Sequence, residues 1–581
     1  MSYLNGPRIN FWGGGSTNVD TANNDGNGIV DLTTASVISD KTDDQLIDFL
    51  RQPGANDKGD NYYSVGGWNY YGDHQVAFMN ARVSSFGHPG SVTTSGDIMD
   101  LPVYLLGSVD PNSGDGPYGG PVMVDLDPTS SQTTQIYAGG LQIGNENPVL
   151  LVRGNSVCHS RFLGLRYDRN STSPPYLTPG SVYASGTFQL AFPKSAVHSY
   201  DKTIQILHDI IEAPNAIGIV LRFSMFEFMP GKSTDEMQPD YARNFNDANP
   251  SLGRIIGSIG PWYEGEPATV SPGRLLQNNK LGGAQGLAHL DAANKLISLD
   301  LISALQGDQI RQNAQDNTSP IGPNVDYGNL QIGTAAGSLV STPSLPDSYY
   351  LQGGIYDVQL DNNAVDTLTD NAIEITSSKN GLSISESPMR IYSNDRNIYI
   401  DYVGDSASMD LQVTELGGPV RSATTVDVAS GDSGTLPDAG FLNFPATVSV
   451  PAGASSVTFN VSDNGGNAGF LSLNFTIGES ASYFINFRKY PIDDFSAVIS
   501  TGNIPWDIVY ENCLRFYYII FPAMSKRIPL NDQPTINAVA GEILKRTSPQ
   551  YRDTTLYMPL TRSLSPGKVA LLQAYLNGNS N

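Results

Sequence analysis

Cysteine is nearly absent from this 581-residue sequence, which contains only Cys158 and Cys513. Two cysteines so distant in the chain exclude a disulfide scaffold, although one bridge between them stays open. Positive charge is also scarce, since 33 Lys and Arg residues face 57 Asp and Glu residues and leave a net charge of −24. Phosphate binding needs a basic face, so this balance argues against nucleic acid and anionic membrane surfaces as partners.

Long apolar runs are missing as well. No stretch approaches the roughly 18 consecutive apolar residues of a membrane-spanning helix, so we expect no membrane span. The first residues, MSYLNGPRINFW, lack the basic segment and the apolar run of a signal peptide. We therefore expect a cytoplasmic protein, with export by a non-classical route as the alternative.

What the sequence does contain is typical of β-rich domains. Glycine (59 residues) and proline (37 residues) are abundant and charged residues make up only 15%, which favours short strands joined by tight turns. We predict a mainly β fold with minor α: a multidomain β-sandwich or barrel body, an immunoglobulin-like sandwich and a short C-terminal helical tail. The predicted segments are a β-rich N-terminal domain (1–200), a mixed α/β continuation of the body (201–320), a β-rich segment (321–402), the immunoglobulin-like sandwich (403–490) and the helical region (491–581).

Three stretches predict individual strands. Residues 8–12 (RINFW) predict a first strand, which we expect the glycines at 13–15 to end. Residues 217–228 (IGIVLRFSMFEF) are too continuously apolar for a surface strand and predict a central one. In 457–461, apolar and polar residues alternate as in a half-buried strand.

Helices are predicted at three places. Thr42 and Gln45 form a capping box at the start of a short helix. Residues 202–212 predict a second helix, with His208 on its apolar face as a core residue. In the last ninety residues, apolar residues at three-four spacing predict amphipathic helices that pack onto the body.

Residues 254–267 (RIIGSIGPWYEGEP) lie near the middle of the chain and combine apolar, glycine, proline, aromatic and acidic residues. Glycine permits unusual backbone angles and proline fixes its own. We interpret the stretch as a connector: an apolar strand, an exit at Gly260-Pro261, and an aromatic-acidic turn pinned by a neighbour.

Cys158 and His159 form the one adjacent pair of soft ligands in the sequence. A thiolate or an imidazole could bind haem or a transition metal. The alternative is structural, because a free cysteine is among the most buried residue types. A further histidine, His74, follows Asp73, which could orient its imidazole, although adjacent residues in an extended loop usually point apart.

Two acidic segments are candidate calcium sites. Asn23, Asp25 and Asp31 lie in a glycine-rich loop that has the oxygen ligands calcium requires, but its register does not fit an EF-hand. Asp125 and Asp127 bring two carboxylates to a strand end. The alternatives are an ordinary polar loop for the first segment and a turn cap for the second.

The sequence contains no nucleophile elbow, phosphate-binding loop or dinucleotide fingerprint, so no catalytic residue can be assigned. Its 29 tyrosines and 21 phenylalanines suit sheet cores, and they equally suit sugar-binding or partner-binding faces.

Several stretches together resemble a known family. They are 8–11, 23–25, 67–69, 80–83, 124–128, 135–137, 254–267, 494–495 and 510–531. The sequence is similar to bacterial proteins related to the N-terminal, non-ferritin-like part of the iminophenylpyruvate dimer synthase (chromopyrrolate synthase) family of violacein and rebeccamycin biosynthesis, and to their uncharacterised relatives. The resemblance implies a shared scaffold, and the family's enzymes are haem-associated and couple imines derived from aromatic amino acids. The ferritin-like domain with paired ExxH motifs is not found here, which weakens the transfer of that activity.

Three functions are open at this point. The first is a non-catalytic structural or binding scaffold, or an assembly component, with protein partners or self-association. The second is a haem- or metal-dependent oxidative enzyme, or its subunit, for imines derived from aromatic amino acids, with Cys158 or His159 as ligand. The third is a calcium- or glycan-binding surface protein.

Overall fold

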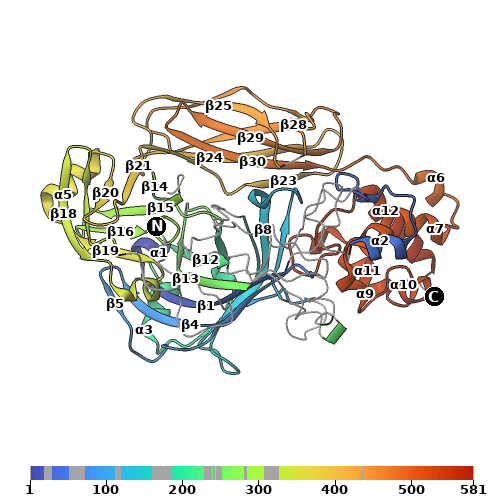
Figure 1. Cartoon of the computed structure of the whole chain (residues 1–581), viewed down its shortest axis with the longest axis horizontal. Coiled ribbons are helices and arrows are strands. Elements are labelled where there is room, and N and C mark those ends of the chain that lie inside the picture. Colours follow the sequence, from blue (N-terminus) through green and yellow to red (C-terminus); the bar gives the residue numbers. More distant parts are fainter. Residues whose placement is uncertain are drawn as a thin grey trace.

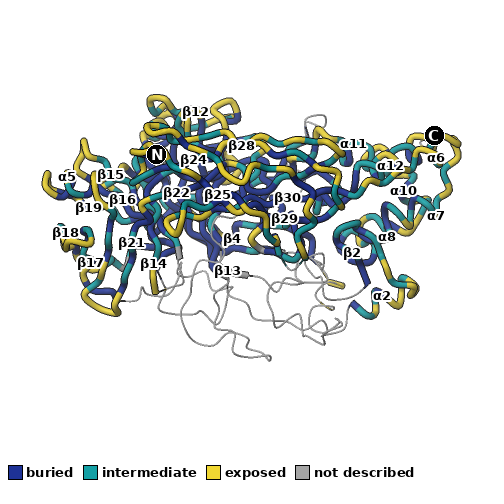
Figure 2. The backbone as a smooth tube through the Cα atoms, turned by 90° about the horizontal axis from the view of Figure 1, so that it is seen from above, coloured by how far each residue is buried: buried dark blue, intermediate teal, exposed yellow. Residues whose placement is uncertain are grey.

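The computed structural model describes residues 2–18, 29–50, 72–110, 120–159, 186–227, 239, 242–243, 252–280, 284–305, 326–434 and 436–579. The chain is mainly β, as predicted, with a short helical stretch at its C-terminal end. Figure 1 shows a sandwich above a strongly curved sheet, with a second sheet at one end and the helices at the other. In Figure 2 the buried residues follow the strands, and the exposed ones lie along the outer rim.

The first sheet has 11 strands in the described part of the chain, in the order β10-β12-β13-β1-β4-β7-β8-β9-β11, with β5 on β4 and β6 on β8. Strand β10 packs beside β9 near the other end of the order, so the sheet curls around one apolar core. The strands are β1 (Arg8–Asn18), β4 (Gln75–His88), β5 (Ser91–Thr93), β6 (Val103–Leu106), β7 (Val122–Asp125), β8 (Thr134–Ile143), β9 (Leu150–His159), β10 (Gly186–Pro193), β11 (Val197–Tyr200), β12 (Ala216–Glu227) and β13 (Leu252–Tyr263).

Strand β1 does not end at the glycines, contrary to the sequence-based expectation. It continues to Asn18 between β13 and β4. At Gly13 a Cβ atom would lie 2.4 Å from the Cα of Ala81, so only glycine allows β1 and β4 to approach this closely. The glycines therefore permit close strand packing here.

Residues 254–267 also differ from expectation. Strand β13 runs through Gly260 and Pro261 to Tyr263, and β12 pairs with it along this length. Pro261 lacks an N–H, but its pairing with β1 has already ended at Ile259, so no ladder hydrogen bond is lost on that side. The turn after the strand is held by its own groups, because Trp262 Nε1 donates to Glu266 O across 2.9 Å.

Helix α3 (Gln205–Ile211) covers one end of the curled sheet, close to the predicted 202–212. Its buried residues are Ile206, Leu207, Ile210 and Ile211. The prediction that His208 is a core residue is wrong, because its side chain is 51% exposed. The apolar face of the helix includes Ile206 and Ile210, so it is rotated away from His208 relative to the predicted face.

The second sheet has 8 strands in the described residues, in the order β18-β17-β20-β21-β14-β15-β16-β19. Its core also takes Trp12, Phe226 and Ile256 from the first sheet. The short helix α1 (Ser2–Asn5) packs where the two sheets meet. The other elements are β14 (Arg274–Asn278), β15 (Ala284–Asp291), β16 (Leu296–Asp300), β17 (Asn329–Thr334), β18 (Gly337–Ser344), η6 (Asp347–Gln352), β19 (Ile355–Gln359), α5 (Asn362–Asp370), β20 (Glu374–Ser377) and β21 (Ser383–Ser387).

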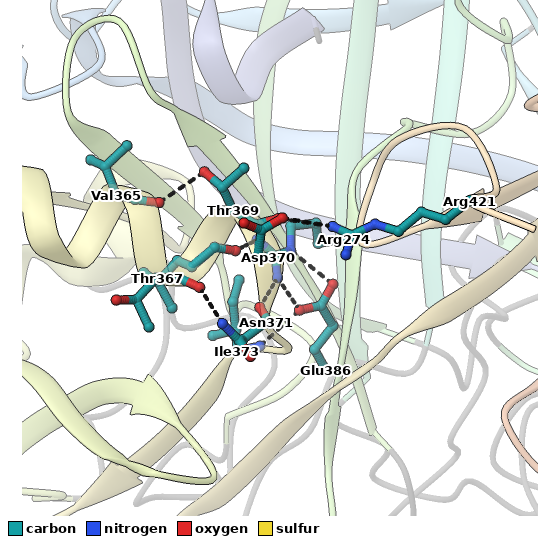
Figure 3. Close-up of polar contacts among 10 residues, drawn as sticks. Arg274, Val365, Thr367, Thr369, Asp370, Asn371, Ile373, Glu386 and Arg421 are labelled. Atoms are coloured by element: carbon teal, nitrogen blue, oxygen red, sulfur yellow. Dashed lines mark hydrogen bonds and ion pairs between the residues drawn. The ribbon is translucent and has the colours of Figure 1, made fainter. Parts of the chain in front are cut away.

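The side chain of Arg274 joins the start of β14 to β21 through a buried ion pair and to the end of α5 through hydrogen bonds. Arg274 donates to both carboxylate oxygens of Glu386, at 2.8 and 2.5 Å, and also to the carbonyl oxygens of Leu368 and Asn371. Glu386 in turn accepts from the N–H of Ile373. Figure 3 shows this network beside the exposed Arg421–Asp370 pair.

The sandwich consists of a 4-stranded sheet (β22-β24-β28-β26) and a 5-stranded sheet (β23-β30-β29-β25-β27) in the described residues. Phe459 and Val461 of β28 face the shared core, which confirms the alternation read in 457–461. Its assignment as immunoglobulin-like stays a prediction. The strands are β22 (Met389–Tyr392), β23 (Asn397–Ile400), β24 (Ser406–Glu415), β25 (Thr424–Gly431), β26 (Leu442–Asn443), β27 (Thr447–Val450), β28 (Ser456–Asp463), β29 (Gly469–Ile477) and β30 (Ala481–Lys489).

The helical region combines both ends of the sequence, and Figure 1 shows α2 among the C-terminal helices. The capping box is confirmed, since Thr42 N donates to Gln45 Oε1 and Gln45 N to Thr42 Oγ1. Among the described residues, no helix is long and apolar enough to cross a membrane. The elements are β2 (Val30–Asp31), β3 (Ser36–Val37), α2 (Asp43–Leu50), α6 (Ser496–Ile499), α7 (Trp506–Val509), the π-helix η7 (Tyr510–Leu514), α8 (Arg515–Ile520), α9 (Pro522–Ser525), α10 (Gln533–Ala538), α11 (Ala540–Arg546), η8 (Pro549–Tyr551) and α12 (Pro566–Asn579).

Candidate functional site

A pocket of about 360 Å³ opens between the helical region and the first sheet. We call it the helical pocket. Its wall comes from η7, α8, α9, α11 and α12, from the connecting segments 527–530 and 558–564, and from the start of β4. Its lining residues are Asp73, Gln75, Cys513, Leu514, Tyr517, Phe521, Ala523, Met524, Arg527, Ile528, Leu530, Val539, Glu542, Ile543, Arg546, Thr547, Met558, Pro559, Leu560, Leu564 and Leu572.

The local sequence explains why these side chains face inward. Residues 506–520 form one continuous helical path, with the π turn η7 between α7 and α8. The three-four spacing places Cys513 and Phe516 in the same buried cluster. Strand β7 of the first sheet packs one face against the helices. Val122 and Val124 belong to the core of the helical region, whereas Met123 between them points into the core of the curled sheet.

Cys513 lies in the pocket wall and is buried. Burial raises the pKa of its thiol to about 12, because the thiolate would be poorly solvated there. Its Sγ donates to the Lys568 carbonyl oxygen across 3.3 Å. Near neutral pH this cysteine is therefore a protonated, apolar wall group and a poor nucleophile.

The charged residues of the lining are Asp73, Arg527, Glu542 and Arg546. On α11, Arg546 Nε donates to Glu542 Oε2 across 3.4 Å, and the Glu542 side chain is 58% exposed. On the sheet side, Asp73 Oδ1 accepts from Gln75 N across 3.2 Å. An apolar chamber with a few polar groups is the usual form of a small-molecule site.

The Asp73-His74 pair lies at this wall. His74 has a positive φ of 59° and is 1% exposed. Its Nδ1 lies 2.8 Å from the Met123 carbonyl oxygen, and its ring meets Phe521 edge-on at 5.6 Å. The imidazole thus supports a pocket-lining ring, and the carboxylate of Asp73 reaches the lining itself.

Cys158 and His159 are consecutive on β9, so their side chains point to opposite faces of the sheet. Cys158 is fully buried in the core of the curled sheet. His159 faces the sandwich, where its Nδ1 lies 3.3 Å from Asn397 Nδ2. One metal ion could not reach both side chains. Neither residue lines the helical pocket, and both are at most 9% exposed, so the residues present here do not fit a haem.

The residues predicted as calcium ligands do not form one site among the described residues. Asn23 and Asp25 fall outside the described residues, and Asp31 accepts from the N–H groups of Thr33 and Thr34 in the β2–β3 turn.

Asp125 accepts from Thr134 Oγ1, whereas Asp127 accepts from Thr129 and from Ser433 of the sandwich. Asp127 thus caps its turn, whereas Asp125 bonds the hydroxyl of its cross-strand partner on β8. No cluster of at least three His, Cys, Asp or Glu side chains fit to hold a metal ion occurs in the described part of the chain.

The sequence analysis predicted the helical tail but missed its pocket. The helix pattern predicts which residues turn inward, but a pocket requires knowledge of how far apart the helices lie. An available signal was the excess of large apolar residues in 510–531, which exceeds what one amphipathic face requires.

No family model matches the sequence. The chain is 21% identical over 631 aligned residues to the 2-imino-3-(indol-3-yl)propanoate dimerase of Chromobacterium violaceum, which supports a relationship. The match covers 99% of this chain and 58% of that protein, so the chain spans little more than half of the relative.

Solved structures are much less similar. A family 2 glycosyl hydrolase from Bacteroides cellulosilyticus is 8% identical over 33% of this chain and 22% of its own, with a TM-score of 0.14. Trypsin-activated alpha-2-macroglobulin from Escherichia coli is 10% identical over 71% of this chain and 29% of its own, with a TM-score of 0.15. These scores are too low to inform the fold.

Proposed function

We propose that this chain is a binding scaffold, with the helical pocket as the site that receives an apolar group of its ligand. The observation that carries the proposal is the wall of the pocket, where aliphatic and aromatic side chains predominate and Cys513 stays protonated. Its volume of about 360 Å³ falls within the range of small-molecule pockets, roughly 300–1,000 Å³. The β body then serves to hold the helices in place.

A pocket-filling variant tests the proposal. Ile543 is half-buried on α11 and lines the pocket, so Ile543→Trp should fill part of it. The next residue, Leu544, is also half-buried but does not line the pocket, which makes Leu544→Trp the matched control. Binding of an anilinonaphthalene dye is the readout. We expect the wild type and the control to bind and Ile543→Trp to lose most of the binding.

Equal dye binding by all three proteins would contradict the proposal. The assembly role has a separate test, the particle mass by size exclusion with light scattering. A strictly monomeric chain that captures no partner would argue against the assembly role. The small-molecule role would then depend only on the dye-binding result.

A second candidate is an oxidative enzyme, or a subunit of one, for imines derived from aromatic amino acids. The relative at 21% identity favours it, since that protein is named a dimerase of an indole-bearing imine. A ring of that kind is apolar and could enter the helical pocket. Titration of indole-3-propionate into wild type and Ile543→Trp, together with an absorption spectrum in the Soret region, tests this candidate. Absence of both binding and a Soret band would count against it.

The third reading, a calcium- or glycan-binding surface protein, depends on the acidic loops. Asp31 and Asp127 already cap turns, so calcium would have to compete with backbone and hydroxyl donors there. Melting in the presence and absence of a chelator tests it, and equal midpoints would remove the calcium part.

A further inference from the structure

The wall of the helical pocket includes a π turn. Cys513 and Leu514 line the pocket and belong to η7, between α7 and α8. The Arg515 N–H closes this turn by donating to the Tyr510 carbonyl oxygen, five residues earlier. Leu514, with φ −120° and ψ −35°, departs from the α-helical angles of about −63° and −42°. The helix is therefore widened at the pocket wall, by a kind of turn that is rare within α-helices.

One carboxylate at the start of α2 bridges the two residues that close this turn. Asp43 Oδ1 accepts from Arg515 Nε across 2.8 Å, and Asp43 Oδ2 accepts from the Tyr510 hydroxyl across 2.5 Å. Burial and the Asp43 carboxylate raise the pKa of Tyr510, so its hydroxyl remains a donor. Arg515 also donates to the Lys41 carbonyl oxygen across 3.1 Å and to Glu511 Oε1 across 2.7 Å. The start of α2 thus holds both ends of the π turn.

The bridge fits a π turn and does not fit an α-helix. At 3.6 residues per turn, side chains five residues apart point in directions about 140° apart, which is too divergent for one short carboxylate to reach both. In a π turn, the hydrogen bond between residues five apart stacks them one turn above the other, on the same side of the helix. The two oxygens of Asp43, bound to Tyr510 and Arg515, therefore match the wider turn.

The π turn decides which side chains face the pocket. If it relaxed to an α-helix, the residues on one side of it would rotate by about 100° around the helix axis relative to those on the other side. Cys513 and Leu514 would then no longer share a wall with Tyr517 of α8 and Phe521, which follows α8. The shape of the pocket therefore depends on the turn.

We propose that Asp43 is a positioning residue of the helical pocket, because it holds the π turn whose side chains form part of the wall. Helix α2 then controls the shape of a pocket that it does not itself line. This inference rests on the binding function proposed for the pocket. Loss of the bridge lowers the affinity of the pocket for an apolar ligand and loosens the turn around Cys513.

Dye binding by the full chain is the first test. Asp43→Ala removes both bonds, and the affinity for an anilinonaphthalene dye should fall about tenfold, which corresponds to one hydrogen bond to a charged group. Thr42→Ala is the matched control, because it removes the bond from Gln45 N to Thr42 Oγ1 at the same end of α2. Its affinity should equal that of the wild type. Equal affinities of Asp43→Ala and the wild type would overturn the proposal.

Labelling of Cys513 by a thiol reagent is a readout that needs no ligand. In a Cys158→Ala background Cys513 is the only thiol, and because it is buried it should react slowly. Asp43→Ala should be labelled several-fold faster than Thr42→Ala, which accounts for a general loss of α2 stability. Equal labelling rates of the two variants would mean that Asp43 acts on stability alone, and would overturn the proposal.

The two readouts separate this proposal from the function on which it rests. A wild type that binds no dye would contradict the binding function, and the labelling comparison would then decide the role of Asp43. If Asp43→Ala does not fold, Tyr510→Phe replaces it in both tests. That variant removes one hydroxyl and keeps the ring, which stacks on Trp506 with centroids 6.0 Å apart.

Discussion

Arg515 on α8 donates through Nε to Asp43 Oδ1 of α2 across 2.8 Å, and so joins residues 472 positions apart. The same carboxylate accepts from the Tyr510 hydroxyl through Oδ2 across 2.5 Å. One aspartate near the start of the sequence thus holds two turns of a C-terminal helix.

Asp43→Ala should loosen this contact. Because the Asp43 side chain is 27% exposed, we expect a loss of only about 1 kcal/mol in unfolding free energy by urea titration. Asp44→Ala is the control, because Asp44 lies in the same first turn and is exposed. Equal losses for both variants would mean that the helix N-terminus, rather than the contact with Arg515, accounts for the effect.

The Arg274–Glu386 pair predicts a much larger effect. Arg274→Met leaves a carboxylate buried without its cation, and removing one partner of such a pair costs roughly 3–5 kcal/mol. Arg421→Met, at the exposed pair beside it, should cost at most about 1 kcal/mol. Chemical denaturation measures both. The double variant Arg274→Met/Glu386→Gln should lose less than the sum of the single variants, and strict additivity would contradict the coupling.

A side chain at position 13 should clash with the neighbouring strand. In Gly13→Ala the new methyl group would lie 2.4 Å from the Ala81 backbone, and overpacking of this kind costs about 1–3 kcal/mol. Gly541→Ala is the contrast, because nothing lies within 4 Å of its added Cβ. Its lower unfolded-state entropy should stabilise the protein by about 0.5 kcal/mol. Midpoints that shift in the same direction would refute the argument.

The unfolding free energy should depend on pH through His289. Burial lowers its pKa from 6.5 to about 4, so the folded state binds this proton less readily than the unfolded state does. The contribution of His289 to stability is therefore present above pH 6.5 and is lost as the pH falls toward 4. His289→Leu should flatten the fall in unfolding free energy across that window, whereas His198→Leu, at an exposed position, should leave the slope unchanged. An unaltered slope in His289→Leu would disprove this role.

Local patterns were enough to predict the β-rich fold, the capping box at Thr42 and the C-terminal helices. Each of these depends on neighbours in sequence, such as the reciprocal bonds of Thr42 with Gln45. The length of β1 was not predictable in the same way. Gly13 is explained by Ala81 of β4 and Gly15 by Ile255 of β13, and no local pattern contains the positions of these neighbours.

The candidate site illustrates the same limit. Cys158 and His159 are adjacent in sequence and were predicted as a ligand pair. Consecutive residues of a strand, however, point to opposite faces of the sheet. The pocket residues come instead from segments between Asp73 and Leu572, and only tertiary packing brings them together. The buried pair of Arg222 with Asp300 likewise joins residues 78 positions apart.

The placement of β1 between β13 and β4 has a consequence for folding kinetics. Ile9 pairs with Ile259, and Asp43 accepts a hydrogen bond from Arg515. The contacts that complete the first sheet and the helical region are therefore distant in sequence. Proteins dominated by such contacts have high contact order and fold slowly, because long loops must close before the contacts form. The early segments therefore stay unpaired until the later segments have been synthesised, and their apolar strand faces are exposed to aggregation during that interval.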